Sequence, residues 1–363
     1  MIARLLPAVN DSTELVEVHE RRTTNPKGDR EMGGKTATKV GQSGLDKKTL
    51  LNFLHQMLLI RKFEDKAGEL YARGKIAGFL HLYNGEEAVA VGAISALEPH
   101  DLVITHYRDH GHALARGMDV KRCMAELFGK ATGVSKGHGG SMHFFDATLG
   151  FYGGWAIVGG HLPLAVGLGL ASNYLRKNQV ILCIFGDGGT NIGYFYESLN
   201  VAKLWNVPVV FLCENNLYGM GTAHHRASAI REVYRKAAVF DIPAERVDGM
   251  DVLAMREATV KAVAHARAGG GPYFLEAMTY RFRGHSMADP ILYRDKSEVE
   301  EWKQRDPIIL FQQRLREEGV LTPQDLEQME RETDELVADA VKFAEESPEP
   351  PLSDLHEDIY ANP

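Results

Sequence analysis

Cysteine is scarce in this chain, and its spacing excludes a disulfide framework or a zinc site. Only Cys123, Cys183 and Cys213 occur among the 363 residues, and no two of them form a C-x-x-C motif. Cys183 and Cys213 lie inside apolar runs, where a thiol usually behaves as a small buried hydrophobic group. The pattern therefore predicts free thiols in a reducing compartment.

Long apolar runs and an excess of basic charge are also missing. No apolar run approaches the ~18 residues needed to cross a bilayer, so no membrane contact is predicted. The formal net charge of −8 disfavours a nucleic-acid binder, whose surface is usually basic. Residues 1–44 mix acidic and basic side chains, whereas a mitochondrial presequence is poor in acids. We expect a disordered or arm-like N-terminal tail there, on a bacterial cytoplasmic protein.

Two common nucleotide-binding motifs are absent as well. The chain has no G-x-x-x-x-G-K-[ST] loop, which excludes a P-loop. A dinucleotide fingerprint beginning at Gly186 would require glycine or alanine at position 191, where the chain has Asn191. A nicotinamide or P-loop nucleotide site is therefore not predicted.

The sequence does contain alternating strand-like and helix-like segments, and 44% of its residues are hydrophobic. The apolar runs at 180–185 and 207–212 are bounded by turn residues, as is typical of buried parallel strands. Strands are also expected at 101–105 and 273–279, a Gly-rich loop at 133–160, and helices at 46–73, 86–97, 120–129, 162–176, 191–205, 252–268 and from 297 onward. This order predicts an α/β fold, a doubly wound and mostly parallel sheet with a helical C-terminal extension.

Polar fragments follow two neighbouring strands of the predicted sheet. Asp187 stands between Gly186 and Gly188 after the first strand, and Asn216 follows the second. Ligands of open α/β sheets bind at the carboxyl ends of the strands. A carboxylate and an amide oxygen suit a hard cation that bridges to a diphosphate, although a plain turn or a helix cap at Asp187 is the structural alternative. The combination predicts a magnesium diphosphate cofactor.

These fragments belong to a larger set of segments that resembles a known family. The G-D-G…N pair matches the signature of thiamine diphosphate enzymes, and the surrounding sequence resembles the alpha subunits of the decarboxylating component of pyruvate dehydrogenase complexes. The matching segments are GFLHLY at 78–83, GGSMH at 139–143, FYGG at 151–154, IVG at 157–159, ENNLYGMGT at 214–222 and YRFRGHS at 280–286. The resemblance implies a thiamine diphosphate-binding α/β domain with a helical extension at 45–345, followed by a C-terminal arm at 346–363.

The resemblance also implies the residues of the site. Asp187, Asn216 and the main-chain carbonyl of Tyr218 would hold Mg²⁺, and His81 and His285 would be catalytic, moving protons near neutral pH. The implied cofactor-binding residues are Tyr107, Arg108, Ala156, Ile157, Val158, Asp187, Gly188, Gly189, Asn216, Tyr218, Arg281 and His285. Taken singly, such an arginine or histidine is more often structural, and Ile157 and Val158 would equally suit a core.

The chain is expected to need a partner. Residues 297–363 are too few and too helical for a second α/β domain. In the family that the chain resembles, a beta subunit supplies the glutamate that activates the cofactor. We therefore expect an α₂β₂ heterotetramer that decarboxylates pyruvate and reductively acetylates the lipoyl group of an acyltransferase core. Acetoin or a branched-chain 2-oxo acid as substrate, and a catalytically silent subunit, are the alternatives.

Overall fold

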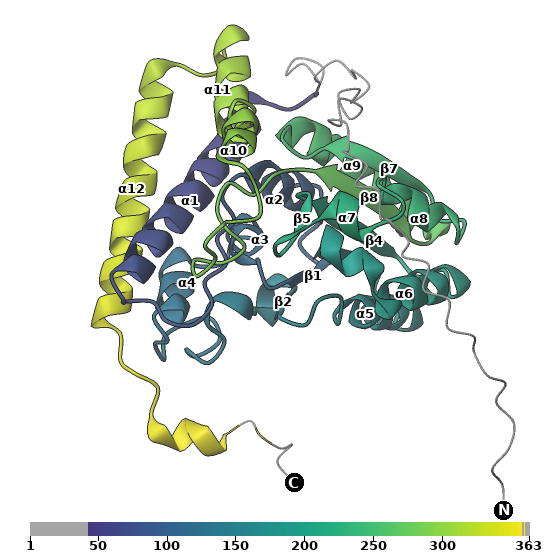
Figure 1. The fold of residues 1–363 in the computed structure, drawn as a ribbon, viewed down its shortest axis with the longest axis horizontal. Coiled ribbons are helices and arrows are strands. Elements are labelled where there is room, and N and C mark those ends of the chain that lie inside the picture. Colours follow the sequence, from purple (N-terminus) through teal and green to yellow (C-terminus); the bar gives the residue numbers. More distant parts are fainter. Residues whose placement is uncertain (1–42, 358, 360–363) are drawn as a thin grey trace, which may run out of the picture. The chain divides into compact units, whose positions relative to one another are not determined.

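A six-stranded parallel sheet organises the part of the chain that this computed structural model describes, residues 43–357 and 359 (Figure 1). The strands lie in the order β2-β1-β3-β4-β8-β7, and each neighbouring pair is parallel. Their bounds are β1 Leu102–His106, β2 Phe151–Trp155, β3 Ile181–Gly186, β4 Val209–Asn215, β7 Ala244–Asp248 and β8 Tyr273–Met278. A two-residue antiparallel pair, β5 Tyr218–Gly219 and β6 Thr222–Ala223, follows β4.

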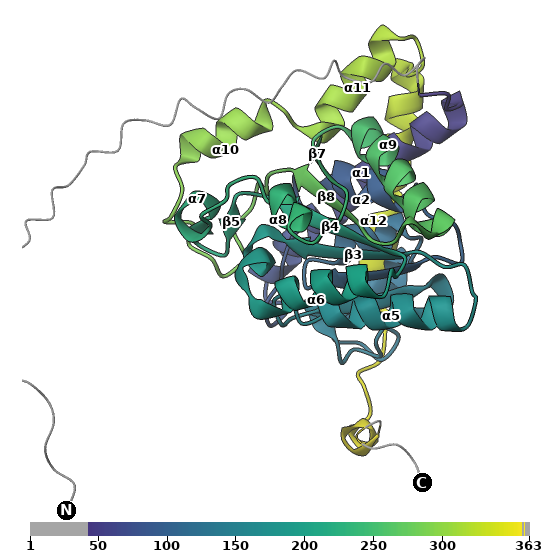
Figure 2. The same cartoon turned by 90° about the vertical axis from the view of Figure 1, so that its right-hand side faces the viewer.

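Helices cover both faces of the sheet and enclose a separate hydrophobic cluster on each. Their bounds are α1 Lys47–Ala72, α2 Glu87–Ile94, α3 His110–Ala115, α4 Val120–Leu127, α5 Leu162–Tyr174, α6 Gly193–Leu204, α7 His224–Ala227, α8 Tyr234–Ala238, α9 Val252–His265, α10 Lys296–Lys303, α11 Pro307–Glu317 and α12 Pro323–Glu346. Figure 2 shows α5 and α6 below the strands, with α1, α2 and α9 on the opposite face. The predicted doubly wound α/β fold is confirmed.

Two edge strands were not predicted from the sequence. The segment 133–160, expected as a Gly-rich loop, contains β2, and the polar segment of β7 was not assigned. Strand β2 has two glycines and no alternation of apolar and polar residues, so its strand character comes from pairing with β1, where the register is irregular between Val103 and Thr105. Edge strands pair on one side only and carry a weaker apolar signal than central strands.

The sequence predicted an N-terminal tail and a C-terminal arm. The N-terminal tail at 1–44 lies outside the described residues, apart from its last two. At the other end, α12 stops at Glu346, and a short 3-10 helix, Leu352–His356, follows it. Within the described part of the chain, no helix has both the length and the apolar character needed to cross a membrane.

A partly buried arginine joins three helices and gives a test of what holds them together. Arg61 of α1 binds Glu87 of α2, with Nε 2.5 Å from Oε1, and Asp306 before α11, with Nη1 2.8 Å from Oδ2. Glu87 is fully buried, so removing the arginine would leave an uncompensated charge. We expect Arg61→Met to lower the free energy of unfolding by about 3–5 kcal/mol, measured by denaturant titration.

The control for this prediction is a second contact between α1 and the C-terminal helices. Lys47 pairs with Asp325 at 3.2 Å, but its side chain is 54% exposed. Solvent screens such a pair, so Lys47→Ala should change stability very little. Equal effects of Arg61→Met and Lys47→Ala would show that the buried pair does not hold the helices together.

Candidate active site

The predicted site residues gather at the carboxyl edge of the sheet, around a cavity of about 500 Å³. Twelve of the thirteen line it: His81, Tyr107, Arg108, Ala156, Val158, Asp187, Gly188, Gly189, Asn216, Tyr218, Arg281 and His285. Ile157 does not, because its side chain is 70% exposed and lies outside the lining. Residues from six separate segments therefore meet at one place, as expected for the edge of a parallel sheet.

Oxygen-bearing side chains from two neighbouring strand ends line this cavity. Asp187 directly follows β3 and Asn216 directly follows β4, and these strands are paired with Gly186 opposite Glu214. Both side chains are buried, and both line the cavity together with Tyr218 of β5. Neither the 3-10 helix at 187–191 nor α6 has a side-chain cap, so the capping alternative for Asp187 is wrong. A carboxylate and an amide oxygen are the kinds of ligand that a hard cation prefers.

The neighbouring asparagine faces away from the cavity. Asn215 Nδ2 donates to Glu276 Oε1 at 2.7 Å, and its Oδ1 accepts from the Leu217 N–H at 3.2 Å. Leu217 has a φ of 73°, a left-handed conformation that a leucine rarely adopts. Successive side chains at the end of a strand point to opposite sides, and of the two asparagines only Asn216 lines the cavity.

Two buried guanidinium groups supply positive charge. Arg108 and Arg281 are each 2% exposed and both line the cavity. Arg108 donates to the carbonyls of Leu82 and His285 at 2.7 and 2.8 Å, and Arg281 donates to Tyr293 Oη at 3.0 Å. Burial, and then the charge of Arg281, lower the pKa of Arg108. An anion in the cavity would relieve this repulsion, so the pair is suited to phosphate oxygens.

The two predicted catalytic histidines line the cavity side by side, with their rings in edge-to-face contact. The ring centroids of His81 and His285 are 5.2 Å apart, and Tyr107 contacts both rings. Burial, followed by the charge of Arg108, lowers the pKa of His81 to about 2; burial, Arg108 and Arg281 lower that of His285 to about 3. Both imidazoles are therefore neutral here, unlike the near-neutral titration expected from the sequence. Their Nδ1 atoms are buried with no hydrogen-bond partner among the described residues.

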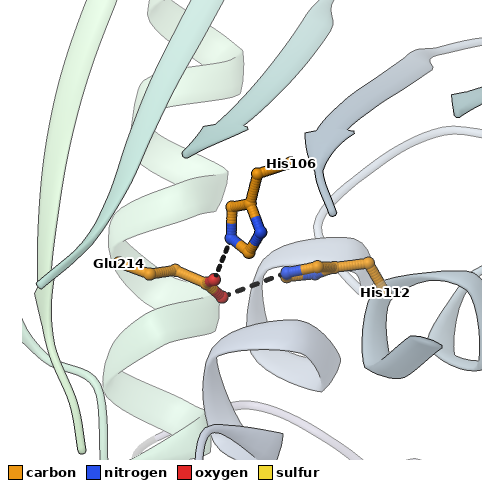
Figure 3. A group of neighbouring side chains, drawn as sticks. All are labelled: His106, His112 and Glu214. Atoms are coloured by element: carbon orange, nitrogen blue, oxygen red, sulfur yellow. Dashed lines mark hydrogen bonds and ion pairs between the residues drawn. The ribbon is translucent and has the colours of Figure 1, made fainter. Parts of the chain in front are cut away.

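The sequence analysis missed a buried polar group beside the cavity (Figure 3). Glu214, at the end of β4, accepts from His106 Nε2 at 2.7 Å and from the Tyr83 hydroxyl, and His112 Nε2 is 3.0 Å away. Burial alone would raise the pKa of Glu214, but the charges and hydrogen bonds of His112 and His106 lower it overall. The sequence did contain one signal for this group. Three closely spaced histidines, His106, His110 and His112, follow the strand predicted at 101–105.

His106, His112 and Glu214 are residue types that can bind a metal ion, but their hydrogen bonds indicate a network without one. His106 Nδ1 accepts a hydrogen bond from the Arg108 N–H at 3.0 Å, so the ring proton is on Nε2. A metal-binding imidazole normally donates its second ring N–H to an acceptor, and His106 has a donor in that place. His106 therefore donates to Glu214 and fixes the end of β1, which carries Tyr107 and Arg108.

Asp109 continues this segment and makes the stability of the fold depend on pH. Its Oδ2 accepts from the Phe144 N–H at 3.0 Å, and burial raises its pKa from 3.8 to about 8. Between about pH 4 and pH 8 the folded chain holds a proton that the unfolded chain has lost, so this group's contribution to stability falls as pH rises. The side chain of Asp109→Asn cannot ionise, so the variant does not lose this contribution. The unfolding temperature of the variant minus that of wild type should therefore be larger near pH 9 than near pH 6. Calorimetry at both pH values tests this, and a constant offset would contradict a protonated carboxyl.

The chain matches a family model and curated proteins along most of its length. Residues 55–353 match the family described as "Dehydrogenase E1 component". The chain is 47% identical over 343 residues to the pyruvate dehydrogenase E1 component subunit alpha of Rhizobium meliloti, which covers 94% of this chain and 97% of the relative. Proteins of the same name from Porphyra purpurea and Zymomonas mobilis are 45% and 47% identical, covering 90% and 89% of this chain and 96% and 90% of the relatives.

Proposed function

Because the chain belongs to the dehydrogenase E1 component family, we propose that it is the alpha subunit of a pyruvate dehydrogenase. This enzyme oxidatively decarboxylates pyruvate and acetylates the lipoyl group of an acyltransferase core. The observation that carries the proposal is the agreement of family, relatives' names and coverage of nearly the full length of both chains. Acetoin is not favoured as the substrate, since the relatives reported above are named for pyruvate.

The family uses thiamine diphosphate, and the residues around the cavity fit this cofactor with a magnesium ion. Arg108 and Arg281 are buried positive charges that an anionic diphosphate would neutralise. Asp187, Asn216 and the main-chain carbonyl of Tyr218 would hold the ion, because Mg²⁺ prefers oxygen ligands. Bound thiamine diphosphate supplies the nucleophilic carbon for decarboxylating a 2-oxo acid.

Two histidines of the cavity, His81 and His285, are suited to proton transfer. His81 and His285 each present a buried, unpartnered Nδ1 among the described residues, and both rings are neutral. A neutral imidazole can accept a proton, and an anion near Arg108 and Arg281 would offset the charges that lower the two pKa values. We assign these histidines to holding or donating a proton beside the substrate.

We further propose that a beta subunit completes the site in an α₂β₂ assembly. The described residues form one parallel sheet and contain no second α/β domain that could supply the activating glutamate. Phe79, Val158 and Met220 line the cavity, yet each is at least 45% exposed. Apolar side chains at the mouth of a site are suited to contact with a partner subunit.

The test is dye-coupled oxidation of pyruvate by the chain purified with its beta subunit, with and without thiamine diphosphate and Mg²⁺. We expect cofactor-dependent turnover of pyruvate, little turnover of acetoin, and almost none by the alpha chain alone. Preference for acetoin would replace the substrate, and full turnover by the alpha chain alone would refute the need for a partner. No cofactor-dependent activity on either compound would leave a silent subunit or a branched-chain 2-oxo acid enzyme as the alternatives.

A further inference from the structure

Glu86 is a buried carboxylate at the beginning of α2 that the site prediction did not include. It is fully buried, and all eight residues of α2 behind it are buried as well. Its Oε1 accepts a hydrogen bond from Asn216 Nδ2 at 3.1 Å, and its Oε2 is 3.8 Å from Arg108 Nε. Oε2 has no hydrogen-bond partner among the described residues. Glu86 thus contacts both a residue assigned to the metal and one assigned to the diphosphate.

The contact with Glu86 decides which end of the Asn216 amide faces the cavity. An asparagine amide has donors on nitrogen and an acceptor oxygen, and only the oxygen can bind a cation. With Nδ2 held by Glu86, Oδ1 is left on the cavity side, where the Tyr218 N–H approaches it at 3.4 Å. The flipped amide would leave Glu86 Oε1 without its N–H donor and would turn the NH₂ group toward the cavity.

The adjacent glutamate shows that burial alone does not explain this contact. Glu87 is equally buried, but both of its oxygens are bound by Arg61 at 2.5 and 3.0 Å. Glu87 therefore joins α2 to α1, whereas the Glu86 side chain contacts Asn216, which lines the cavity. Two neighbouring carboxylates at one helix end have different partners, which makes them a matched pair for experiment.

We propose that Glu86 is a positioning residue that fixes the Asn216 amide with its oxygen toward the metal. The inference rests on the proposed function, because it takes Asn216 as a ligand of the magnesium ion. Outer partners that orient a metal ligand typically contribute about 10–100-fold to metal affinity. Glu86 acts by placing an acceptor oxygen beside Asn216 Nδ2, so another side chain of the same length with an acceptor oxygen should replace it.

Three variants of the α–β complex distinguish the effect of the length of the Glu86 side chain from that of its carboxyl group and from that of burial. Glu86→Gln keeps the length and an acceptor oxygen but removes the carboxyl group, Glu86→Asp keeps a carboxyl group but withdraws it by one methylene, and Glu87→Gln is the control. Calorimetric titration with Mg²⁺ in the presence of thiamine diphosphate measures the metal affinity directly. We expect a loss of about 10–100-fold for Glu86→Asp and a change below about 3-fold for Glu86→Gln and Glu87→Gln. Glu87→Gln should lower the unfolding temperature instead.

Each result decides the question. Wild-type affinity in Glu86→Asp, an equal loss in Glu86→Gln, or an equal loss in Glu87→Gln would overturn the positioning role. Glu86→Ala, which has no acceptor, replaces Glu86→Asp if that variant does not assemble, and should show at least the same loss. If the wild-type complex itself binds no Mg²⁺ with the cofactor, the proposed function fails and the inference fails with it. A wild-type complex that binds, beside a Glu86→Asp complex that binds equally well, refutes the inference alone.

Discussion

Asp187→Asn should remove most of the magnesium affinity while leaving the fold intact. Asp187 contributes the only carboxylate among the three assigned ligands, and it is 2% exposed. Replacing the carboxylate with an amide keeps its shape but removes the charge that attracts a divalent cation. We expect the Mg²⁺ requirement to rise by more than the roughly 10–100-fold typical of losing an outer partner.

The measurement is calorimetric titration of the α–β complex with Mg²⁺ at a fixed concentration of thiamine diphosphate, followed by turnover of pyruvate at high Mg²⁺. Asp187→Asn should unfold no more readily than wild type in the absence of metal, because it removes a buried charge. Asp241→Asn is the control, since the Asp241 side chain is 98% exposed. Unchanged magnesium affinity in Asp187→Asn would refute the ligand assignment.

His285→Ala should lower kcat by about 10²–10⁴-fold, the range typical of a lost general acid or base. The His285 ring lines the cavity, contacts His81 and presents an unpartnered Nδ1. Its main chain is held separately, with the N–H donating to Asp289 Oδ2 at 2.6 Å and the carbonyl accepting from Arg108. Truncating the ring therefore leaves the backbone contacts of the loop in place, and cofactor affinity should change much less than kcat.

Steady-state oxidation of pyruvate and calorimetric titration of the cofactor separate these two effects. His100→Ala is a suitable control, because His100 is exposed and precedes β1, at the opposite edge of the sheet from the cavity. A fall in kcat of less than about tenfold for His285→Ala would rule out a proton-transfer role for this ring. An equal fall in cofactor affinity would assign His285 to binding instead.

Sequence reasoning located the site because its main signals are local. The apolar runs that became β3 and β4 are continuous and end at turn residues, so the strands and their carboxyl ends could be predicted. The rule that parallel strands present their carboxyl ends at one edge then brought Asp187 and Asn216 together, and the structure places both on one cavity. The arginines and histidines came from the family resemblance, and all four also line that cavity.

Glu86 and Glu214 show where sequence reasoning stopped. The residues after Glu86 and Glu87 are apolar on every face of α2, which indicates a fully buried helix and hence buried acids at its start. Nothing in that pattern says that the Glu86 carboxylate meets Asn216, 130 residues later in the chain. Likewise, Glu214 contacts His106 across 108 residues, and no local periodicity records such a pair.

The sequence by itself determined the α/β class, the strands of the sheet centre and the edge on which the site lies, because these depend on burial patterns within single segments. Only the tertiary structure decided the edge strand β2, the neutral state of His81 and His285, and the partners of Glu86. Those features arise from pairing, desolvation and charge between segments far apart in the chain, which act only once the sheet has brought its strand ends together.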